Sequence, residues 1–214
     1  MRKYLSRFLI SAGILIIIIA VFQKVSTVYY EKKLISEYSE YMDAIESEEL
    51  KAEEESNNET DNVNGTAEEK PAAKAFDYDK ALKGKDISGI IEIPKINVKS
   101  AILEGTDDRA LKYAVGHYPK LGKLGEGNYV LLGHRNYVYG HFFRNLDDLA
   151  KGDEVIITRG SDTYTYEVYE SFVVKPEEVW VLKQTKDPII TMITCTPIGT
   201  YTDRLIVRAS LKDE

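Results

Sequence analysis

The sequence predicts a mainly β fold, a closed barrel with a few short helices at its periphery. From about residue 86 onward, β-branched and aromatic segments alternate with turns rich in Gly, Pro, Asn and Asp. Such spacing is typical of antiparallel sandwiches and barrels. Only two short stretches show helical spacing of apolar residues, and neither is long enough to form a helical layer. A two-sheet sandwich is the alternative architecture.

The expected strands are β-branched or aromatic tracts that end at turn residues. They cover residues 87–93, 98–103, 129–132, 154–158, 163–174, 189–194 and 205–211. One short helix is expected over residues 107–113 and a second over residues 142–150. In the second, the apolar side chains of Phe142, Phe143, Leu146 and Leu149 recur at helical spacing.

Residues 1–30 indicate a signal anchor. Arg2, Lys3 and Arg7 precede residues 8–23, a run of 16 residues that carries no charge. As a helix this run would span about 24 Å, and flanking basic side chains can reach the interface on either side. We expect an uncleaved transmembrane anchor with a cytoplasmic N-terminus and the remaining chain outside the cell. A cleaved secretory signal is the alternative.

Residues 31–75 are predicted to form an extracytoplasmic linker. Its first part, to about residue 50, could continue as a helix, and its second part is acidic. Residues 46–70 contain ten acidic residues and two lysines, a net charge of −8. Such a composition cannot bury enough apolar surface to offset the entropy of the chain, so we expect a solvated tether. The predicted organisation is therefore an anchor (1–30), a linker (31–75) and a folded β domain (76–214).

Composition excludes several function classes. The chain has 214 residues, one cysteine and a formal net charge of −7. A single cysteine rules out an intramolecular disulfide framework and a cysteine-based zinc site. The negative charge, with no basic stripe to offset it, argues against binding of nucleic acid.

Cys195 is the first candidate catalytic residue. It follows an apolar strand and precedes a turn that begins at Pro197. Its structural alternative is a small buried hydrophobic residue. A nucleophilic thiol needs a base, and His134, at the end of another apolar strand, is favoured over His117 and His141 for that role.

Arg204 is the candidate for holding a substrate carbonyl or its developing oxyanion. It lies at the start of the strand that would return beside Cys195. A guanidinium there can donate to an oxygen that backbone amides leave unsatisfied. A surface ion pair with Asp203 is the competing interpretation.

Taken together, these motifs resemble the sortases, the cysteine transpeptidases of Gram-positive cell surfaces. The resemblance rests on Gly133-His134-Arg135, on the TMITC sequence of residues 191–195 and on Arg204, and it extends over most of residues 86–214. Met192 stands where the family usually has Leu, an isosteric change. The residues around the cysteine look most similar to class D sortases.

The resemblance implies an eight-stranded barrel with a catalytic Cys195, His134 and Arg204, and a substrate contact at Thr194. It also implies cleavage of an LPXTG-like sorting signal after Thr through a thioacyl intermediate. The partners it implies are surface proteins that carry the signal and an amine of a peptidoglycan precursor. Some sortases bind calcium through loop acids, but we expect no metal ion and no cofactor here.

Two other functions stay open. An extracellular cysteine protease would use the same residues but resolve the thioester with water. A non-catalytic, anchored β-barrel binding module would carry Cys195 incidentally, and its thiol would show little reactivity.

Overall fold

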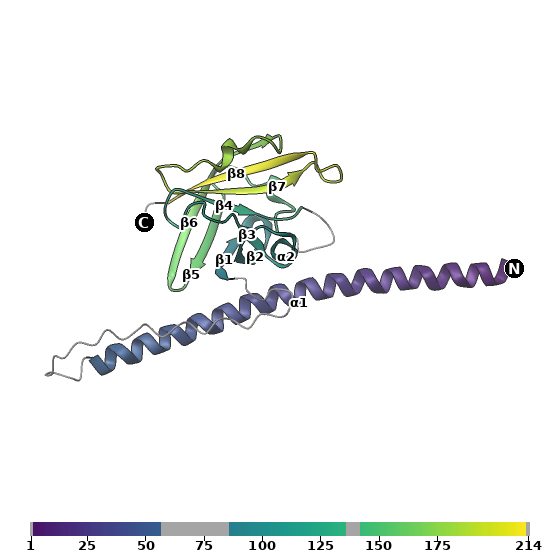
Figure 1. The fold of residues 1–214 in the computed structure, drawn as a ribbon, viewed down its shortest axis with the longest axis horizontal. Coiled ribbons are helices and arrows are strands. Elements are labelled where there is room, and N and C mark those ends of the chain that lie inside the picture. Colours follow the sequence, from purple (N-terminus) through teal and green to yellow (C-terminus); the bar gives the residue numbers. More distant parts are fainter. Residues whose placement is uncertain (1, 57–85, 136–141, 213–214) are drawn as a thin grey trace.

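The computed structural model describes residues 2–56, 86–135 and 142–212 (Figure 1). Its strands close into a barrel in the order β1-β2-β3-β4-β7-β8-β6-β5. They are β1 (Ile87–Ile93), β2 (Val98–Glu104), β3 (Val115–His117), β4 (Asn128–Leu132), β5 (Glu154–Arg159), β6 (Asp162–Val174), β7 (Ile189–Thr196) and β8 (Asp203–Leu211). The closed eight-stranded barrel is confirmed, and the sandwich alternative is wrong.

Two of the strand pairs are parallel, β2 with β3 and β4 with β7, and the remaining pairs are antiparallel. The β4–β7 pair matters most for the site, because the carboxyl ends of parallel neighbours reach the same edge of a sheet. The sequence missed β3, which is three residues long and too short to show an alternating pattern.

The helical elements are α1 (Arg2–Ser56), α2 (Asp108–Tyr113) and three single 3-10 turns. These turns are η1 (Pro94–Ile96), η2 (Leu146–Asp148) and η3 (Val179–Leu182). The helix predicted over residues 107–113 is confirmed as α2. The helix predicted over residues 142–150 is wrong, because only η2 forms there. The carbonyl of Arg144 accepts a hydrogen bond from Arg135 Nε at 2.9 Å, which directs this segment to the barrel wall.

The core fills the barrel with aliphatic and aromatic side chains. Alternate residues of the strands point inward, among them Ile91, Leu131, Ile157 and Met192, all fully buried. The apolar side chains of residues 142–149 join the same cluster. These side chains are therefore buried in the barrel interior although the segment that carries them is a loop with one 3-10 turn and not a helix.

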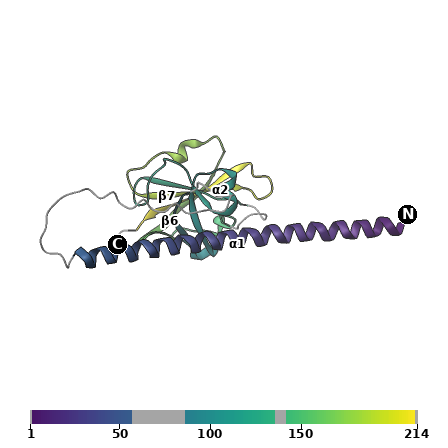
Figure 2. The same ribbon diagram turned by 60° about the horizontal axis from the view of Figure 1, so that its bottom comes forward.

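The middle of α1 packs against the outside of the barrel, beside β1, β2 and α2 (Figures 1 and 2). Leu34 and Tyr38 are only 3% and 6% exposed. Leu34 belongs to a cluster with Leu103 of β2, and the Tyr38 hydroxyl accepts a hydrogen bond from the Gly160 amide at 3.2 Å. α1 continues without a break through residues 30 and 31, where we placed a domain boundary, and through residues 51–56 of the expected tether. The rest of that tether, residues 57–75, lies outside the described residues.

The amino-terminal part of α1 projects beyond the barrel (Figure 1). Most of the side chains described there are open to solvent, with Phe8, Ile16 and Phe22 between 67% and 72% exposed. Among the helices of residues 2–56, 86–135 and 142–212, none meets the length and hydropathy needed to cross a membrane.

Candidate active site

The register of β4, β7 and β8 brings the three predicted catalytic residues into one row. In the parallel ladder, Leu132 of β4 lies opposite Ile193 of β7, an offset of 61 residues. His134 lies two residues beyond the end of β4, and the same offset, extended that far, aligns it with Cys195 (195 − 134 = 61). On the other side of β7, Cys195 is paired directly with Arg204 of β8.

Gly133 allows the chain to leave β4 close to a phenylalanine ring. Its amide donates to the carbonyl of Ile193 at 3.1 Å, which adds one more bond to the ladder. A Cβ atom at this position would lie 2.7 Å from Cδ2 of the buried Phe143 ring. Only glycine fits without displacing the ring, so the Gly-His sequence has a steric cause.

His134 is half-buried at the end of this row. Burial lowers the pKa of its imidazole below the ordinary value of 6.5, and the negative charge of Asp108 at the start of α2 opposes that change. The neutral imidazole is therefore favoured at neutral pH. A neutral ring can accept a proton, as a general base must.

Cys195 is a free thiol, and it is partly exposed while the preceding residues of β7 are fully enclosed. A purely structural cysteine would be buried with those residues. Its position is instead that of a side chain at the rim of the barrel, accessible to a reactant.

Within the described residues, the Arg204 guanidinium bonds to neighbouring carbonyls, since Nη1 donates to Tyr201 and Asp203 at 3.3 and 3.0 Å. The carboxylate of Asp203 is instead bound by Lys175 Nζ at 2.6 Å and by the Thr202 hydroxyl at 2.7 Å. The hydrogen bond from Lys175 lowers the pKa of Asp203. In the part of the chain that the structure describes, the ion pair of Asp203 is therefore made with Lys175.

Thr194 is 2% exposed, and its hydroxyl donates to the carbonyl of Gly133 at 2.7 Å. The hydroxyl thus ties the residue before Cys195 to the residue before His134. A contact between Thr194 and substrate stays a prediction.

The other histidines differ from His134. His117 is buried, with Nδ1 2.9 Å from a carboxylate oxygen of Glu104 and its ring stacked on Tyr129 at 4.1 Å. Its Nε2 donates to the carbonyl of Leu121 at 2.9 Å. His117 is therefore part of the barrel's internal packing, while His141 lies outside the described residues.

Sequence reasoning assigned no role to Arg135. Its side chain is buried, with Nη1 donating to the Thr196 hydroxyl at 2.8 Å and Nη2 2.5 Å from Asp147. The available signal was its position next to His134, but nothing in the sequence links it to Thr196. Asp108 was likewise missed as a charge acting on His134.

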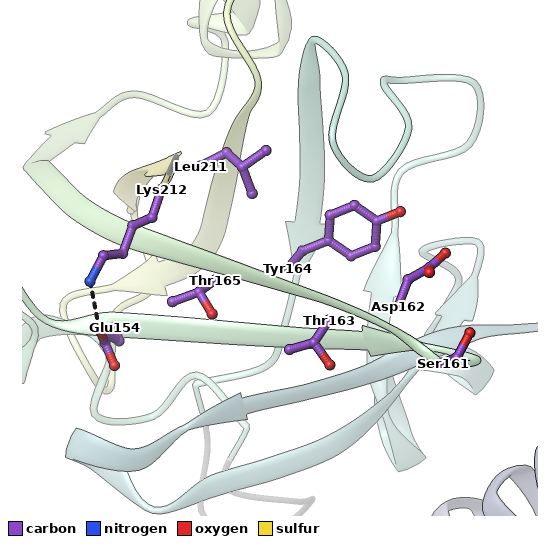
Figure 3. Close-up of a pocket in the computed structure, with 8 residues that line it drawn as sticks. All are labelled: Glu154, Ser161, Asp162, Thr163, Tyr164, Thr165, Leu211 and Lys212. Atoms are coloured by element: carbon purple, nitrogen blue, oxygen red, sulfur yellow. Dashed lines mark hydrogen bonds and ion pairs between the residues drawn. The ribbon is translucent and has the colours of Figure 1, made fainter. Parts of the chain in front are cut away.

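A surface pocket lies away from this row, at the far end of β8 (Figure 3). It is lined by residues 161–165, Glu154, Leu211 and Lys212. The Lys212 ammonium forms an ion pair with the Glu154 carboxylate at 2.9 Å. Leu211 lies seven positions after Arg204 along β8 (211 − 204 = 7), about 24 Å of extended strand. None of the three predicted catalytic residues lines it.

Comparison with known proteins places this geometry in a family. The family model described as the Sortase domain matches residues 91–212. Sortase D of Bacillus subtilis is 36% identical over 126 residues, which cover 56% of this chain and 61% of that protein. The chain spans about three fifths of the length of the first curated relatives that it matches.

Solved structures of sortases also match this chain. A Clostridium perfringens Sortase D5 transpeptidase is 39% identical and superposes with a TM-score of 0.55, covering 60% of this chain and 80% of that one. Clostridium perfringens sortase C, solved with the C-terminal cell wall sorting motif, is 34% identical with a TM-score of 0.56 and covers 60% of this chain and 72% of that one. The shared part is the barrel that carries the row of His134, Cys195 and Arg204.

Proposed function

The chain belongs to the sortase family, and we propose that it is a cysteine transpeptidase acting on proteins with an LPXTG-like sorting signal. One observation carries the proposal. The β7–β8 register pairs Cys195 with Arg204, and the β4–β7 register, extended two residues past the end of β4, aligns His134 with the other side of Cys195. A nucleophile and an oxyanion donor are thus supplied by two adjacent strands, and a base by the segment that directly follows a third.

In the first half of the proposed reaction, the Cys195 thiolate attacks the carbonyl carbon of the Thr residue. Arg204 donates to the oxygen that becomes negative in the tetrahedral intermediate. The carbon–nitrogen bond then breaks, and the leaving amine takes a proton from the His134 imidazolium. The product is a thioester between Cys195 and the new carboxyl end of the substrate.

In the second half, an amine attacks the thioester carbonyl and gives a proton to His134. The carbon–sulfur bond breaks, and Cys195 leaves as the thiolate. Because burial lowers the pKa of His134, the neutral imidazole is favoured at neutral pH, and the imidazolium that protonates the leaving amine is its minor form. The proposed nucleophile is an amine of a peptidoglycan precursor.

Apolar side chains on two connections support a peptide substrate. Val179 and Trp180 of η3, and Ile198 and Tyr201 between β7 and β8, are between 37% and 66% exposed. η3 is held in place by Asn128, whose amide nitrogen donates to the carbonyls of Val181 and Lys183 at 3.0 Å each. Residues 197–202 directly follow β7, and the ion pair from Lys175 to Asp203 joins the start of the η3 connection to β8 next to Arg204. We propose that both connections offer contacts to the apolar residues of a sorting signal.

The proposed setting is the outer face of a Gram-positive cell membrane, with residues 8–23 as a single anchor. The uncharged aliphatic sequence and the exposure of its side chains support this placement. The sequence of residues 195–204 and the 39% identity with a Sortase D5 transpeptidase support a class D assignment.

The test uses the full-length chain in detergent with a panel of fluorogenic LPXTG-like peptides, with and without a short amine, and with products identified by mass spectrometry. We expect cleavage after Thr, an amine-dependent ligated product and a trapped thioester, all lost in Cys195→Ala. Cleavage to the free acid alone, unaffected by amines, would replace the proposal with a protease. An unreactive thiol together with no turnover of any peptide would support the alternative of a non-catalytic binding module.

A further inference from the structure

We propose that Arg135 is a positioning residue that fixes His134 and Cys195 relative to each other through the hydroxyl of Thr196. The inference rests on the proposed function for its kinetic consequences. Arg135 directly follows His134, and Thr196 directly follows Cys195. The hydrogen bond from Arg135 Nη1 to Thr196 Oγ1, at 2.8 Å, therefore joins the two chain segments immediately beyond the reacting residues.

The backbone alone does not hold the two segments together at this point. The parallel β4–β7 ladder ends at Leu132 and Ile193, and the Gly133 amide adds the last backbone bond at 3.1 Å. Beyond it, side chains continue the connection. Thr194 donates to the Gly133 carbonyl one residue before the reacting pair, and Arg135 donates to Thr196 one residue after it. The reacting pair lies between these two cross-strand bonds.

Arg135 is suited to this role because its guanidinium is held from three directions. Nε donates to the Arg144 carbonyl at 2.9 Å, and Nη2 lies 2.5 Å from the carboxylate of Asp147. The side chain is only 5% exposed, so neither water nor rotamer changes compete strongly with these contacts. A planar guanidinium with fixed donor directions transmits position in a way that a flexible lysine ammonium does not.

The expected consequence is kinetic. Without the bond to Thr196, the segment after Cys195 can shift relative to the segment after His134 while the barrel stays folded. Small displacements of reacting groups lower turnover by large factors. Substrate binding through the exposed side chains of η3 does not depend on this bond, so kcat should fall and KM should stay.

The main test is Thr196→Val, which removes the acceptor and preserves the shape of the side chain. Thr196→Ser keeps the hydroxyl, and Thr163→Val makes the same change as Thr196→Val at the exposed far end of the barrel. We expect Thr196→Val to lower kcat by about 10-fold, with KM within about twofold of wild type and a melting temperature lowered by only a few degrees, because one buried donor loses its acceptor. Thr196→Ser should restore kcat to within about twofold, and Arg135→Lys combined with Thr196→Val should add little to the loss from Arg135→Lys alone.

A second measurement does not depend on any peptide. The rate at which iodoacetamide alkylates Cys195, followed against pH, reports the coupling between the thiol and His134. We expect the profile of Thr196→Val to shift, while those of Thr196→Ser and Thr163→Val match wild type. If wild type processes no peptide, the proposed function fails and this profile still decides the role of Arg135.

Two results would overturn the inference. One is a Thr196→Val variant with wild-type kcat and a wild-type alkylation profile. The other is a loss of kcat that accompanies an equal loss of stability and is not rescued by Thr196→Ser, since that pattern describes a structural residue only.

Discussion

Lys175 binds the carboxylate of Asp203 at 2.6 Å, so the acidic neighbour of Arg204 is already held by another cation. Removing the ammonium in Lys175→Met frees Asp203 to pair with Arg204 and to compete with substrate oxygen for the guanidinium. We expect kcat/KM for a sorting-signal peptide to fall by about 3- to 10-fold, because a new pairing costs on the order of 1 kcal/mol.

The control for this effect is the double variant Lys175→Met, Asp203→Asn. With no carboxylate left to compete, it should regain most of the wild-type kcat/KM, and the single variant should improve as salt is added. Equal losses in the single and the double variant would show that Lys175 acts in another way.

A second prediction concerns the titration of His134. Burial lowers the pKa of its imidazole, and Asp108 raises it in part. Asp108→Asn removes that negative charge, so the pKa should fall further and the acidic limb of the pH–rate profile should move to lower pH. NMR titration of the imidazole measures the shift directly. Asp148→Asn, at an exposed position of η2, is the matched control. A pKa of His134 that rises in Asp108→Asn would contradict this electrostatic account.

Gly133 provides a third prediction. Alanine here would set a methyl group 2.7 Å from the Phe143 ring, and such overpacking typically costs about 1–3 kcal/mol. We expect Gly133→Ala to lower both the unfolding free energy and kcat, because His134 moves with the backbone. Adding Phe143→Leu, which makes room for the methyl group, should recover part of the activity. Urea unfolding and steady-state kinetics on the three variants measure both effects.

The docked part of α1 provides a fourth prediction. Leu34→Ala should lower the free energy of unfolding by about 2 kcal/mol, because Leu34 is 3% exposed and packs on Leu103. Leu15→Ala makes the same change at a position of α1 that is 58% exposed, so it should have almost no effect. Denaturation of the full-length chain in detergent compares them. Similar values for the two variants would mean that the docking contributes little to stability.

The contact between α1 and the barrel also affects where a stable fragment of the catalytic domain should begin. We predicted residues 76–214 as the folded domain from the strand pattern after residue 86 and the acidic composition of the linker before residue 76. A fragment that begins at residue 76 lacks Leu34 and Tyr38 and leaves the apolar side chains of Leu103 and Tyr113 uncovered. We expect it to melt at a lower temperature than a fragment that begins at residue 28, which differential scanning calorimetry would show.

Most of the fold was predictable from the sequence, because strand composition and turn residues are local signals. β1 is predicted with both ends correct, and the other long strands differ by one or two residues at their ends. β3 has no local signal, since three residues become a strand only through pairing with β2 and β4. The wrong helix prediction at residues 142–150 has a similar origin. The spacing of apolar residues indicates which side chains are buried, but it does not determine the backbone conformation of the segment.

For the candidate site, the sequence predicted which side chains react, while the contacts around them required the structure. Cys195 and Arg204 lie near the ends of β7 and β8, His134 lies just beyond the end of β4, and strand ends can be inferred from a sequence. Partners such as Thr196 for Arg135 and Lys175 for Asp203 are 61 and 28 residues apart. No spacing rule connects residues so distant, and only the pairing of β4, β6, β7 and β8 brings them together.

Closure of the barrel affects how a peptide substrate can be recognised. A sheet with a free edge can bind an extended peptide as an additional strand, through main-chain hydrogen bonds that are largely indifferent to sequence. Here every described strand has a neighbour on each side, but not along its whole length. Residues 194–196 of β7 extend beyond the register with β4, and residues 168–174 of β6 extend beyond the register with β5. The open backbone beside Cys195 is therefore only three residues long, so we expect a peptide there to make few main-chain bonds and to be selected mainly by side chains and loop ends around the barrel rim.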